Sequence, residues 1–474
     1  MQEKSLRKND RFTVEITEMN NLGCGVGRIS GGYREDGMIA FVKGAVTGET
    51  VEATAIKITK SYIVGKPERI KVRSPYREEV DLCNAPLGCG GCIYRPVSYE
   101  YEKEEKRRYV ENCFRTAGLR DISVLPVISD DRVRGYRNKA QYPVAQGKRG
   151  IVAGFYAAKT HNLIPATDCA LQPPVFAEIV AFICQYATKH RIPAYDETTG
   201  RGLLRHIYLR YGQGTGEVLV TLVVHSPSLD GGYDFAAALH ERFPEVVGVL
   251  LNVNADDTNV VLGSRYITLW GKDVLRDTLC GLEFTIAPSA FWQVNHDGAE
   301  TLYRLAAREA ALTGKETLLD LYCGIGSIGL TMAKDVKELI GIELVPEAVE
   351  CAKENAVMNG ITNASFYCGD ASSAEAFLSA AEVARGERIS ADVVIIDPPR
   401  KGTTKELIDT IAAREIPRVV YVSCAPDTLA RDIAYFMKKG YNPGDVQPVD
   451  MFPRTGHVES VVSLIRGCDV DMRR

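Results

Sequence analysis

The sequence predicts an α/β fold in which a C-terminal Rossmann-like domain follows an N-terminal OB-like β-barrel and an α+β central domain. Two apolar, mostly β-branched runs, 393–396 and 419–422, are typical of strands buried on both faces of a parallel sheet. From residue 316 a strand, a glycine-rich turn and a helix follow one another. The first 72 residues instead contain short, partly alternating runs. For a chain of 474 residues we expect three domains, at 1–72, 73–285 and 286–474.

Composition limits the classes of protein that fit the chain. Its 45% apolar residues support sizeable cores, and its net charge of −4 neither indicates nor excludes nucleic-acid binding. The charged N-terminus lacks the apolar stretch of a signal peptide, and no run is long enough to span a bilayer. We therefore expect a cytoplasmic protein without membrane contact. There, the 13 cysteines are better explained by metal binding or catalysis than by disulfides.

The N-terminal barrel is predicted from four short runs, 12–17, 37–42, 49–54 and 61–66, which are separated by turn residues. This spacing is typical of the small barrels that often bind RNA. A barrel that serves only as a spacer is the alternative interpretation.

A cysteine-rich loop follows the barrel, with Cys83, Cys89 and Cys92 spaced by glycines and a proline. Structural zinc usually takes two paired Cys or Cys/His sets, whereas an iron–sulfur cluster takes four thiolates. Three close cysteines with a distant fourth favour a cluster, although zinc stays open. The candidates for the fourth ligand are Cys113, Cys169 and Cys184. We prefer Cys169, because it lies in a loop-like segment while the other two fall in helical patterns.

Basic residues gather in three places in the first half of the chain. Residues 99–118 predict a charged amphipathic helix that ends at a glycine, and its lysines and arginines are expected to form a solvated face. The segments 132–142 and 201–210 interleave basic residues with tyrosines, which suits RNA phosphates and stacked bases, although edge strands of an α+β domain look similar. The residues concerned are Lys103, Lys106, Arg107, Arg108, Arg132, Arg134, Arg137, Lys139, Arg201, Arg205 and Arg210.

The strand–turn–helix pattern after residue 316 predicts a cofactor site. The backbone of Gly324–Gly329 can approach a ligand closely, and Glu343 ends the next strand, where an acid can bind ribose hydroxyls. The glycine pattern alone suits a dinucleotide equally well. Three acids favour S-adenosylmethionine (SAM) instead: Asp320 inside the first strand, and Asp370 and Asp397 at the ends of the third and fourth.

Two buried strands end in reactive groups. Asp397 is followed by two prolines, and Cys424 comes directly after the run 419–422. Because ligands bind at the carboxyl ends of strands in open α/β sheets, we expect this carboxylate and this thiol at one edge. A buried structural cysteine is the alternative for Cys424.

Taken together, these motifs resemble the family of RNA (uracil-5-)-methyltransferases. The cysteine loop, F-W-Q-V-N at 291–295, the glycine turn, D-P-P-R-K-G at 397–402, Y-V-S-C at 421–424 and H-V-E at 457–459 stand in family order over essentially the whole chain. The branch it resembles most methylates bacterial 23S rRNA and carries an N-terminal TRAM barrel and a 4Fe–4S cluster.

The resemblance implies a SAM-dependent enzyme that methylates carbon 5 of a uridine in RNA, most simply 23S rRNA, with tRNA as the alternative. It implies Cys424 as nucleophile, Glu459 as base, and Asp397 near the uracil or the cofactor. It also implies that helix 98–118 packs on the catalytic domain and that the protein is a monomer. The implied SAM site is Gln293, Tyr322, Ser327, Glu343, Asp370 and Asp397, where relatives often place Asn at the position of Ser327. The implied cluster ligands are Cys83, Cys89, Cys92 and Cys169.

Three alternatives remain. A cytosine-5 enzyme commonly has a second cysteine beside the D-P-P prolines, where this chain has Arg400. An adenine-N6 enzyme has no use for Cys424. A non-catalytic RNA-binding or iron–sulfur scaffold would retain the fold but bind no cofactor.

Overall fold

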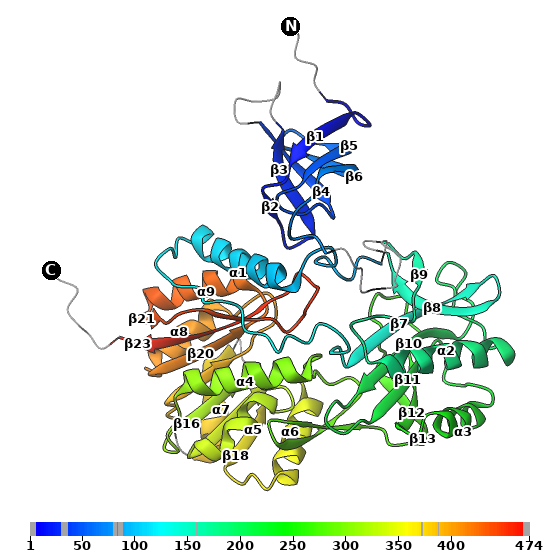
Figure 1. Cartoon of the computed structure of the whole chain (residues 1–474). Coiled ribbons are helices and arrows are strands. Elements are labelled where there is room, and N and C mark those ends of the chain that lie inside the picture. The colour runs from blue at the N-terminus through cyan, green and yellow to red at the C-terminus, as the bar shows by residue number, and fades with distance from the viewer. Residues whose placement is uncertain are drawn as a thin grey trace.

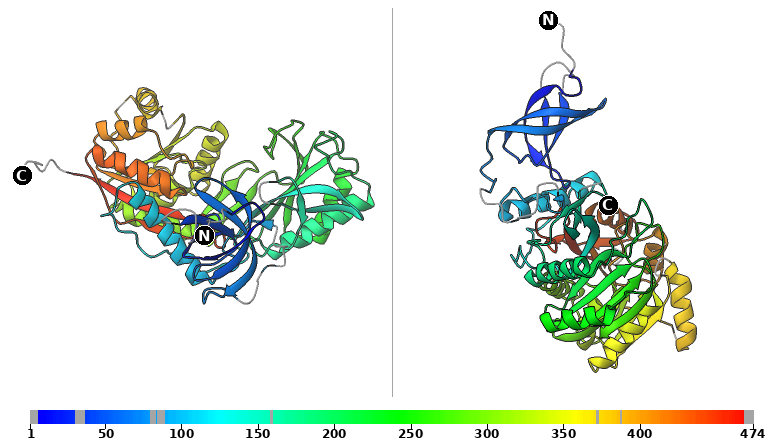
Figure 2. Two further views of the ribbon diagram at one scale, coloured as in Figure 1. Left: turned by 90° about the horizontal axis from the view of Figure 1, so that it is seen from above. Right: turned by 90° about the vertical axis from the view of Figure 1, so that its right-hand side faces the viewer.

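The computed structural model describes residues 6–29, 37–78, 83, 89–157, 160–370, 373–386 and 388–467, without the side chains of 374, 377, 380 and 384. A small barrel stands above two larger units that lie side by side (Figures 1 and 2). One larger unit is built on a seven-stranded sheet, the other on an eight-stranded sheet. No helix within the described ranges has the length and apolar character needed to cross a membrane.

In the residues that the structure describes, the barrel has six strands in the order β1-β5-β6-β4-β3-β2. Buried residues alternate with exposed ones along β1 and β5, which places one face of each in the core. Each predicted run overlaps one strand, but the two-residue β2 and the glycine-containing β3 were not predicted. A Cβ at Gly27 would lie 2.0 Å from the Glu15 carbonyl oxygen, so the strands cross too closely for a side chain. The strands are β1 (Arg11–Glu15), β2 (Glu18–Met19), β3 (Cys24–Ile29), β4 (Met38–Lys43), β5 (Thr50–Ile58) and β6 (Tyr62–Val72).

The seven-stranded sheet has the order β13-β12-β11-β10-β7-β8-β9 and is antiparallel except for the pair β11–β12. The helices α2 (Pro174–Lys189) and α3 (Gly232–Arg242) bury their apolar faces against one side of it. The strands are β7 (Lys139–Gly147), β8 (Gly150–Tyr156), β9 (Leu163–Pro165), β10 (Leu204–Tyr211), β11 (Val218–Val224), β12 (Val246–Val253) and β13 (Arg265–Gly271).

Two arginines of this sheet are structural. Arg205 is buried and donates to the carbonyls of Asn254 and Asp256, both at 2.8 Å. Arg210 is also buried and donates to the Pro288 carbonyl at 3.1 Å. Their charged groups satisfy backbone oxygens, so the interpretation of these two residues as RNA contacts is wrong.

The eight-stranded sheet confirms the predicted α/β fold. Strands β18-β17-β16-β19-β20 are parallel, and β23 pairs antiparallel with β20, β21 and β22. Side chains alternate between two cores: Leu318 and Val393 face one, Leu319 and Val394 the other. The strands are β16 (Thr317–Leu321), β17 (Glu338–Glu343), β18 (Ala364–Cys368), β19 (Val393–Ile396), β20 (Arg418–Ser423), β21 (Tyr441–Pro443), β22 (Gln447–Val449) and β23 (Glu459–Arg466).

Helices cover both faces of this sheet (Figure 1). The first face carries α4 (His296–Ala310), α5 (Ser327–Met332) and α6 (Pro346–Met358), with η2 (Ala333–Asp335) after α5. The second carries α7 (Ala374–Arg385), α8 (Lys405–Ala413) and α9 (Pro426–Lys438). A hairpin of β14 (Leu275–Leu279) and β15 (Leu282–Ile286) packs into the core of the first face, although nearly all of it precedes the boundary predicted at residue 286.

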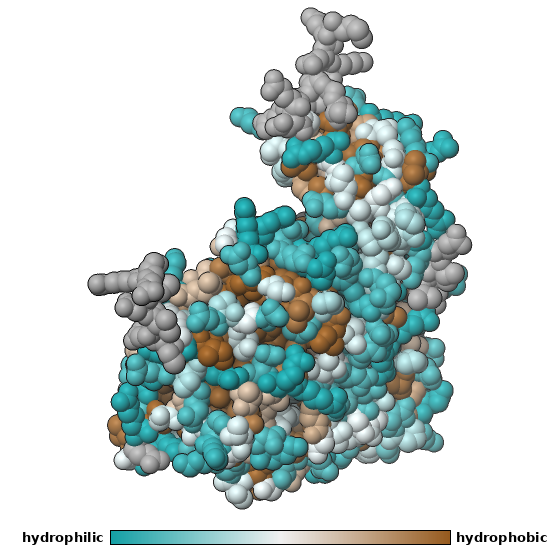
Figure 3. Space-filling view, turned by 60° about the vertical axis from the view of Figure 1, so that its left-hand side comes forward, coloured by the Kyte–Doolittle hydropathy of each residue, from teal (hydrophilic) through white to brown (hydrophobic). Residues whose placement is uncertain are grey.

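The helix α1 (Tyr99–Thr116) is capped at its N-terminus by Ser98, whose hydroxyl accepts the N–H of Tyr101. It buries Val110 and Phe114 in the core of the second face. Much of its outer surface carries charged pairs. Figure 3 shows a face of the molecule on which hydrophilic residues border a hydrophobic area below the barrel. Lys106, however, is 1% exposed and is held by buried carboxylates. The prediction of a solvated face is therefore wrong for this lysine.

Candidate active site

Three strands of the large sheet place their ends at one edge. β19 and β20 are parallel neighbours, so Asp397 and Cys424, the residues that follow them, leave the sheet at the same side. β23 runs antiparallel to β20 with Ser460 opposite Ser423, so Glu459, its first residue, lies beside Cys424. The sheet register thus brings a thiol and two carboxyl groups together.

These groups shift each other's ionisation. Burial raises the pKa of Glu459 to about 8; the Asp397 carboxylate contributes and the Arg400 guanidinium opposes. Burial alone raises the pKa of Asp397 to about 7. Burial, with Glu459 and Asp397, raises the pKa of the Cys424 thiol to about 11, and Arg400 again opposes. Groups whose pKa values are moved toward neutrality in one place can exchange protons with a substrate.

The turn after β16 is adjacent to this edge. Tyr322 has a φ of 66°, a left-handed conformation that is rare for a non-glycine residue, and Gly324 and Gly326 follow with φ values of 55° and 80°. The Cys323 N–H donates to the Ile342 carbonyl at 3.0 Å, which fixes the turn on β17. The backbone here is shaped for close approach by a ligand.

Asp320 lies under this turn and is 1% exposed. Its Oδ2 accepts the N–H of Gly329 at 2.9 Å, whereas its Oδ1 has no hydrogen-bond partner among the described residues. Burial raises its pKa to about 7, with contributions from Asp397 and Glu343. A buried carboxylate oxygen without a partner is costly, so a donor or cation bound here would be stabilised.

The other predicted cofactor residues surround the turn from several elements. Glu343 accepts the N–H groups of Gly324 at 3.1 Å and Val345 at 2.9 Å. The Ser327 hydroxyl lies 2.9 Å from that of Tyr303. Asp370 is exposed beyond the end of β18, whereas Gln293 is buried in the segment before α4. Tyr322 thus belongs to the turn, Ser327 directly follows it, and Glu343 bonds to it from the end of β17. Asp370 follows the neighbouring strand, and Gln293 comes from a separate segment.

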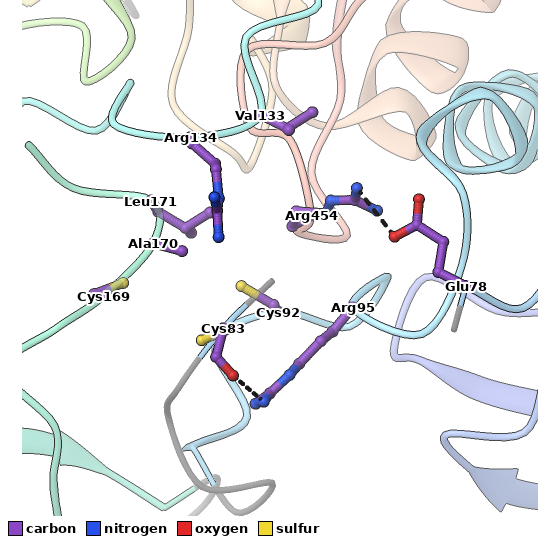
Figure 4. Close-up of a pocket in the computed structure, with 10 residues that line it drawn as sticks. All are labelled: Glu78, Cys83, Cys92, Arg95, Val133, Arg134, Cys169, Ala170, Leu171 and Arg454. Carbon is purple, nitrogen blue, oxygen red and sulfur yellow. Dashed lines mark hydrogen bonds and ion pairs between the residues drawn. The ribbon is translucent and has the colours of Figure 1, made fainter. Parts of the chain in front are cut away.

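The predicted cluster cysteines gather at a second place. Cys83, Cys92 and Cys169 line one pocket together with Arg95, Arg134 and Arg454, and their sulfur atoms face a common opening (Figure 4). Burial raises the pKa of Cys92 to about 12, with contributions from Cys169, Cys83 and Cys89, so all four thiols interact electrostatically. Among the described residues, however, no three Cys, His, Asp or Glu side chains are arranged to hold a metal ion.

Known proteins resemble the chain along nearly all of its length. The family model described as tRNA (uracil-5-)-methyltransferase matches residues 197–467. The chain belongs to this family. Two relatives, both named uncharacterized RNA methyltransferases, are 37% identical over 464 residues (Halalkalibacterium halodurans) and 38% identical over 459 residues (Caldanaerobacter subterraneus). These alignments cover 98% and 96% of this chain, and 98% of each relative.

A solved structure agrees with the family. The Pyrococcus abyssi tRNA (uracil-54, C5)-methyltransferase in complex with S-adenosyl-L-homocysteine superposes with a TM-score of 0.75 at 25% identity, covering 96% of this chain and 99% of that chain. The family resemblance identified from the sequence motifs is therefore confirmed, as is an RNA methyltransferase fold.

Sequence reasoning left two residues out of the predicted site of this family member. Arg400 opposes the negative groups around Cys424 and Glu459, and it could have been found because it directly follows the two prolines after Asp397. Asp320 was recognised as a feature of the first strand but not as a site residue. Its unpaired oxygen depends on the packing around it, which no local pattern reveals.

Proposed function

We propose that the protein transfers a methyl group from SAM to carbon 5 of a uridine in RNA through a covalent bond between Cys424 and the base. The observation that supports this most directly is the Cys424 thiol beside the buried Glu459 carboxyl at the carboxyl edge of β19 and β20. A thiol and a base at one point are what a reaction at an unactivated pyrimidine carbon requires.

The chemistry assigns a separate task to each group. Carbon 5 of uracil is a poor nucleophile, and addition of the Cys424 sulfur to carbon 6 turns the ring into an enolate that can react at carbon 5. Arg400 favours the thiolate that this addition needs. When bound, SAM supplies an electrophilic methyl group. Glu459 then takes the proton from carbon 5, and the electrons of that C–H bond re-form the ring double bond as the C6–S bond breaks. The target base must leave its stack to reach Cys424.

The SAM site is proposed at the turn after β16. The residues that would hold SAM are Gln293, Tyr322, Ser327, Glu343, Asp370 and Asp397. The unpaired Oδ1 of Asp320 and the left-handed backbone of Tyr322 support a ligand in this place.

The RNA substrate is proposed to be 23S rRNA, as the resemblance of the whole motif set implies. A tRNA uridine is the second candidate, because the tRNA enzyme of P. abyssi covers 96% of this chain. In this scheme residues 1–72 are a TRAM-like RNA-binding barrel, 73–285 contact RNA and hold a cluster, and 286–474 carry out methyl transfer in a cytoplasmic monomer.

The purified protein should convert uridine to 5-methyluridine when it is given SAM and RNA. Nucleoside mass spectrometry on transcripts of 23S rRNA segments and of tRNA separates the two substrates. Release of tritium from RNA labelled at carbon 5 of uracil measures the loss of the hydrogen that the methyl group replaces. Methylation of another base, or none with either RNA, would refute the function.

Cys83, Cys89, Cys92 and Cys169 are proposed to hold a 4Fe–4S cluster that ties the cysteine loop to the central unit. The donor set fits, because burial and the neighbouring cysteine thiols raise the pKa of Cys92 and of Cys169, and bound iron would stabilise their thiolates.

Replacing Cys89 with serine is expected to remove the brown colour and the visible absorbance of protein purified without oxygen, with a loss of bound iron and sulfide. The matched control is Cys184→Ser, which changes a half-buried thiol of α2 that the scheme does not use. An unchanged spectrum in Cys89→Ser, or zinc in place of iron by metal analysis, would exclude this ligand set.

Resolution of the covalent intermediate is expected to depend on pH. Because Glu459 acts as a base and its pKa is raised to about 8, the rate should rise about tenfold per pH unit below 8 and level off above it. An adduct formed at low pH and transferred by rapid mixing to buffers of increasing pH isolates this step from attack by Cys424, whose pKa of about 11 affects only adduct formation. A pH-independent rate would contradict the assignment.

A further inference from the structure

The segment that leads into Glu459 is folded as a compact turn, which we call the base loop (residues 450–458). The carbonyl of Phe452 accepts the N–H of Thr455 at 3.0 Å and its hydroxyl at 2.9 Å. The Thr455 hydroxyl accepts the N–H of His457 at 3.4 Å, and the His457 ring packs edge-on against the Phe452 ring with centroids 5.8 Å apart. Phe452 is thus linked through Thr455 to His457, which lies two residues before the start of β23 at Glu459.

Lys106 of α1 holds the base loop from outside the catalytic sheet. Its Nζ donates to Asp450 Oδ1 at 2.7 Å and to the Phe452 carbonyl at 3.1 Å. The same Asp450 oxygen accepts the N–H of Phe452 at 3.0 Å. Lys106 and Asp450 are 1% and 0% exposed, so water does not compete for these bonds. One ammonium group therefore fixes both the start of the loop and the carbonyl on which Thr455 and His457 depend.

The residues that hold the base loop also contact residues 94–97, which follow Cys92 in sequence. Glu102 Oε1 accepts from Lys106 at 2.8 Å and from the N–H of Arg454 at 2.6 Å. The Arg454 side chain donates to the carbonyl of Val97 at 2.7 Å, and its own carbonyl accepts the N–H of Tyr94 at 3.2 Å. Further hydrogen bonds to the base loop come from Tyr136 and Asn295. The loop is therefore held by segments more than 150 residues away in sequence.

We propose that Lys106 is a positioning residue for Glu459, acting through the base loop. This inference rests on the proposed function, in which Glu459 removes the proton from carbon 5. Each of the three donors of the Lys106 ammonium has an acceptor here, and two of those acceptors belong to the base loop. An apolar side chain could pack α1 equally well, since buried ion pairs seldom add net stability. Cys424 is positioned separately, by β20 and by α9.

Lys106→Met is therefore expected to form the methylated adduct but to resolve it slowly. A displacement of about 1 Å at Glu459 would reduce the rate of resolution roughly 10²-fold, with the KM for RNA unchanged. The covalent protein–RNA species should accumulate on a denaturing gel. A residue that only stabilises the fold would lower the melting temperature without producing this species.

The matched control is Lys103→Met, one turn earlier on the same helix. Lys103 pairs with the exposed carboxylates of Glu100 and Asp131, so this variant should resolve its adduct at the wild-type rate. Because Lys106→Met removes the ammonium group that pairs with two buried carboxylates, a triple variant with Glu102→Gln and Asp450→Asn removes those charges as well. The triple variant should regain thermal stability and still accumulate the adduct.

Normal resolution in folded Lys106→Met, or in a stable triple variant, would overturn the inference. Accumulation in Lys106→Met but not in Lys103→Met supports it. Glu459→Gln separates the two levels of the argument. If that variant accumulates adduct and the Lys106 variants do not, the positioning role alone fails. If Glu459→Gln accumulates none, the assignment of Glu459 as the base for carbon 5 fails, and the positioning role fails with it.

Discussion

Replacing Cys424 with alanine is expected to abolish methylation of RNA while SAM binding is retained. The sulfur forms the bond that activates carbon 5, and no other group of the site can replace it, so the rate should fall more than about 10⁴-fold, or about 5 kcal/mol of barrier. The thiol is half-buried at the start of α9 and its loss leaves only a small gap, so the fold should persist. Single-turnover methylation and calorimetric titration with S-adenosylhomocysteine measure the two properties separately.

The covalent step can be tested directly with RNA containing 5-fluorouridine. Fluorine at carbon 5 cannot leave as a proton, so the wild-type protein should remain bonded to this RNA, and Cys424→Ala should not. Cys351→Ala, which changes a half-buried thiol on α6, is the control and should behave like the wild type. Full methylation by Cys424→Ala would refute the nucleophile assignment.

The strands of the catalytic sheet could be predicted because their residues report burial directly. Val393 and Val394 face opposite cores, so an uninterrupted apolar run was a reliable sign of a central parallel strand. The strands of the barrel were harder to predict. Gly27 is required because β3 crosses close to Glu15 of β1, and a contact between two strands is not visible in the sequence of either one.

Charged residues show where sequence reasoning stops. Lys106 and Arg108 both belong to the basic residues of α1, yet one is 1% and the other 47% exposed. The difference arises from Asp450, more than 300 residues later, which no helix pattern can reveal. The site residues were easier to find, because Asp397 and Cys424 directly follow buried strands and the register of a parallel sheet must bring them to one edge.

Replacing Glu459 with glutamine is expected to stop the reaction after methyl transfer, leaving the protein bonded to methylated RNA. Glutamine has nearly the same shape but cannot accept the proton from carbon 5, so resolution should slow by roughly 10²- to 10⁴-fold. At pH 7 the raised pKa of about 8 keeps the Glu459 carboxyl largely protonated, and the neutral amide resembles that form, so stability should change little. A denaturing gel with labelled RNA, followed by nucleoside analysis of the trapped species, measures the effect.

The same substitution leaves the first half of the reaction intact for an electrostatic reason. The Glu459 carboxylate raises the pKa of the Cys424 thiol, so its removal can only make the thiolate easier to form. Adduct formation in Glu459→Gln should therefore be as fast as in the wild type or faster. Glu241→Gln, on the exposed side of α3, is the control and should show no trapped RNA. If Glu459→Gln formed adduct slowly and trapped none, Glu459 would act before methyl transfer, and another group would have to remove the proton from carbon 5.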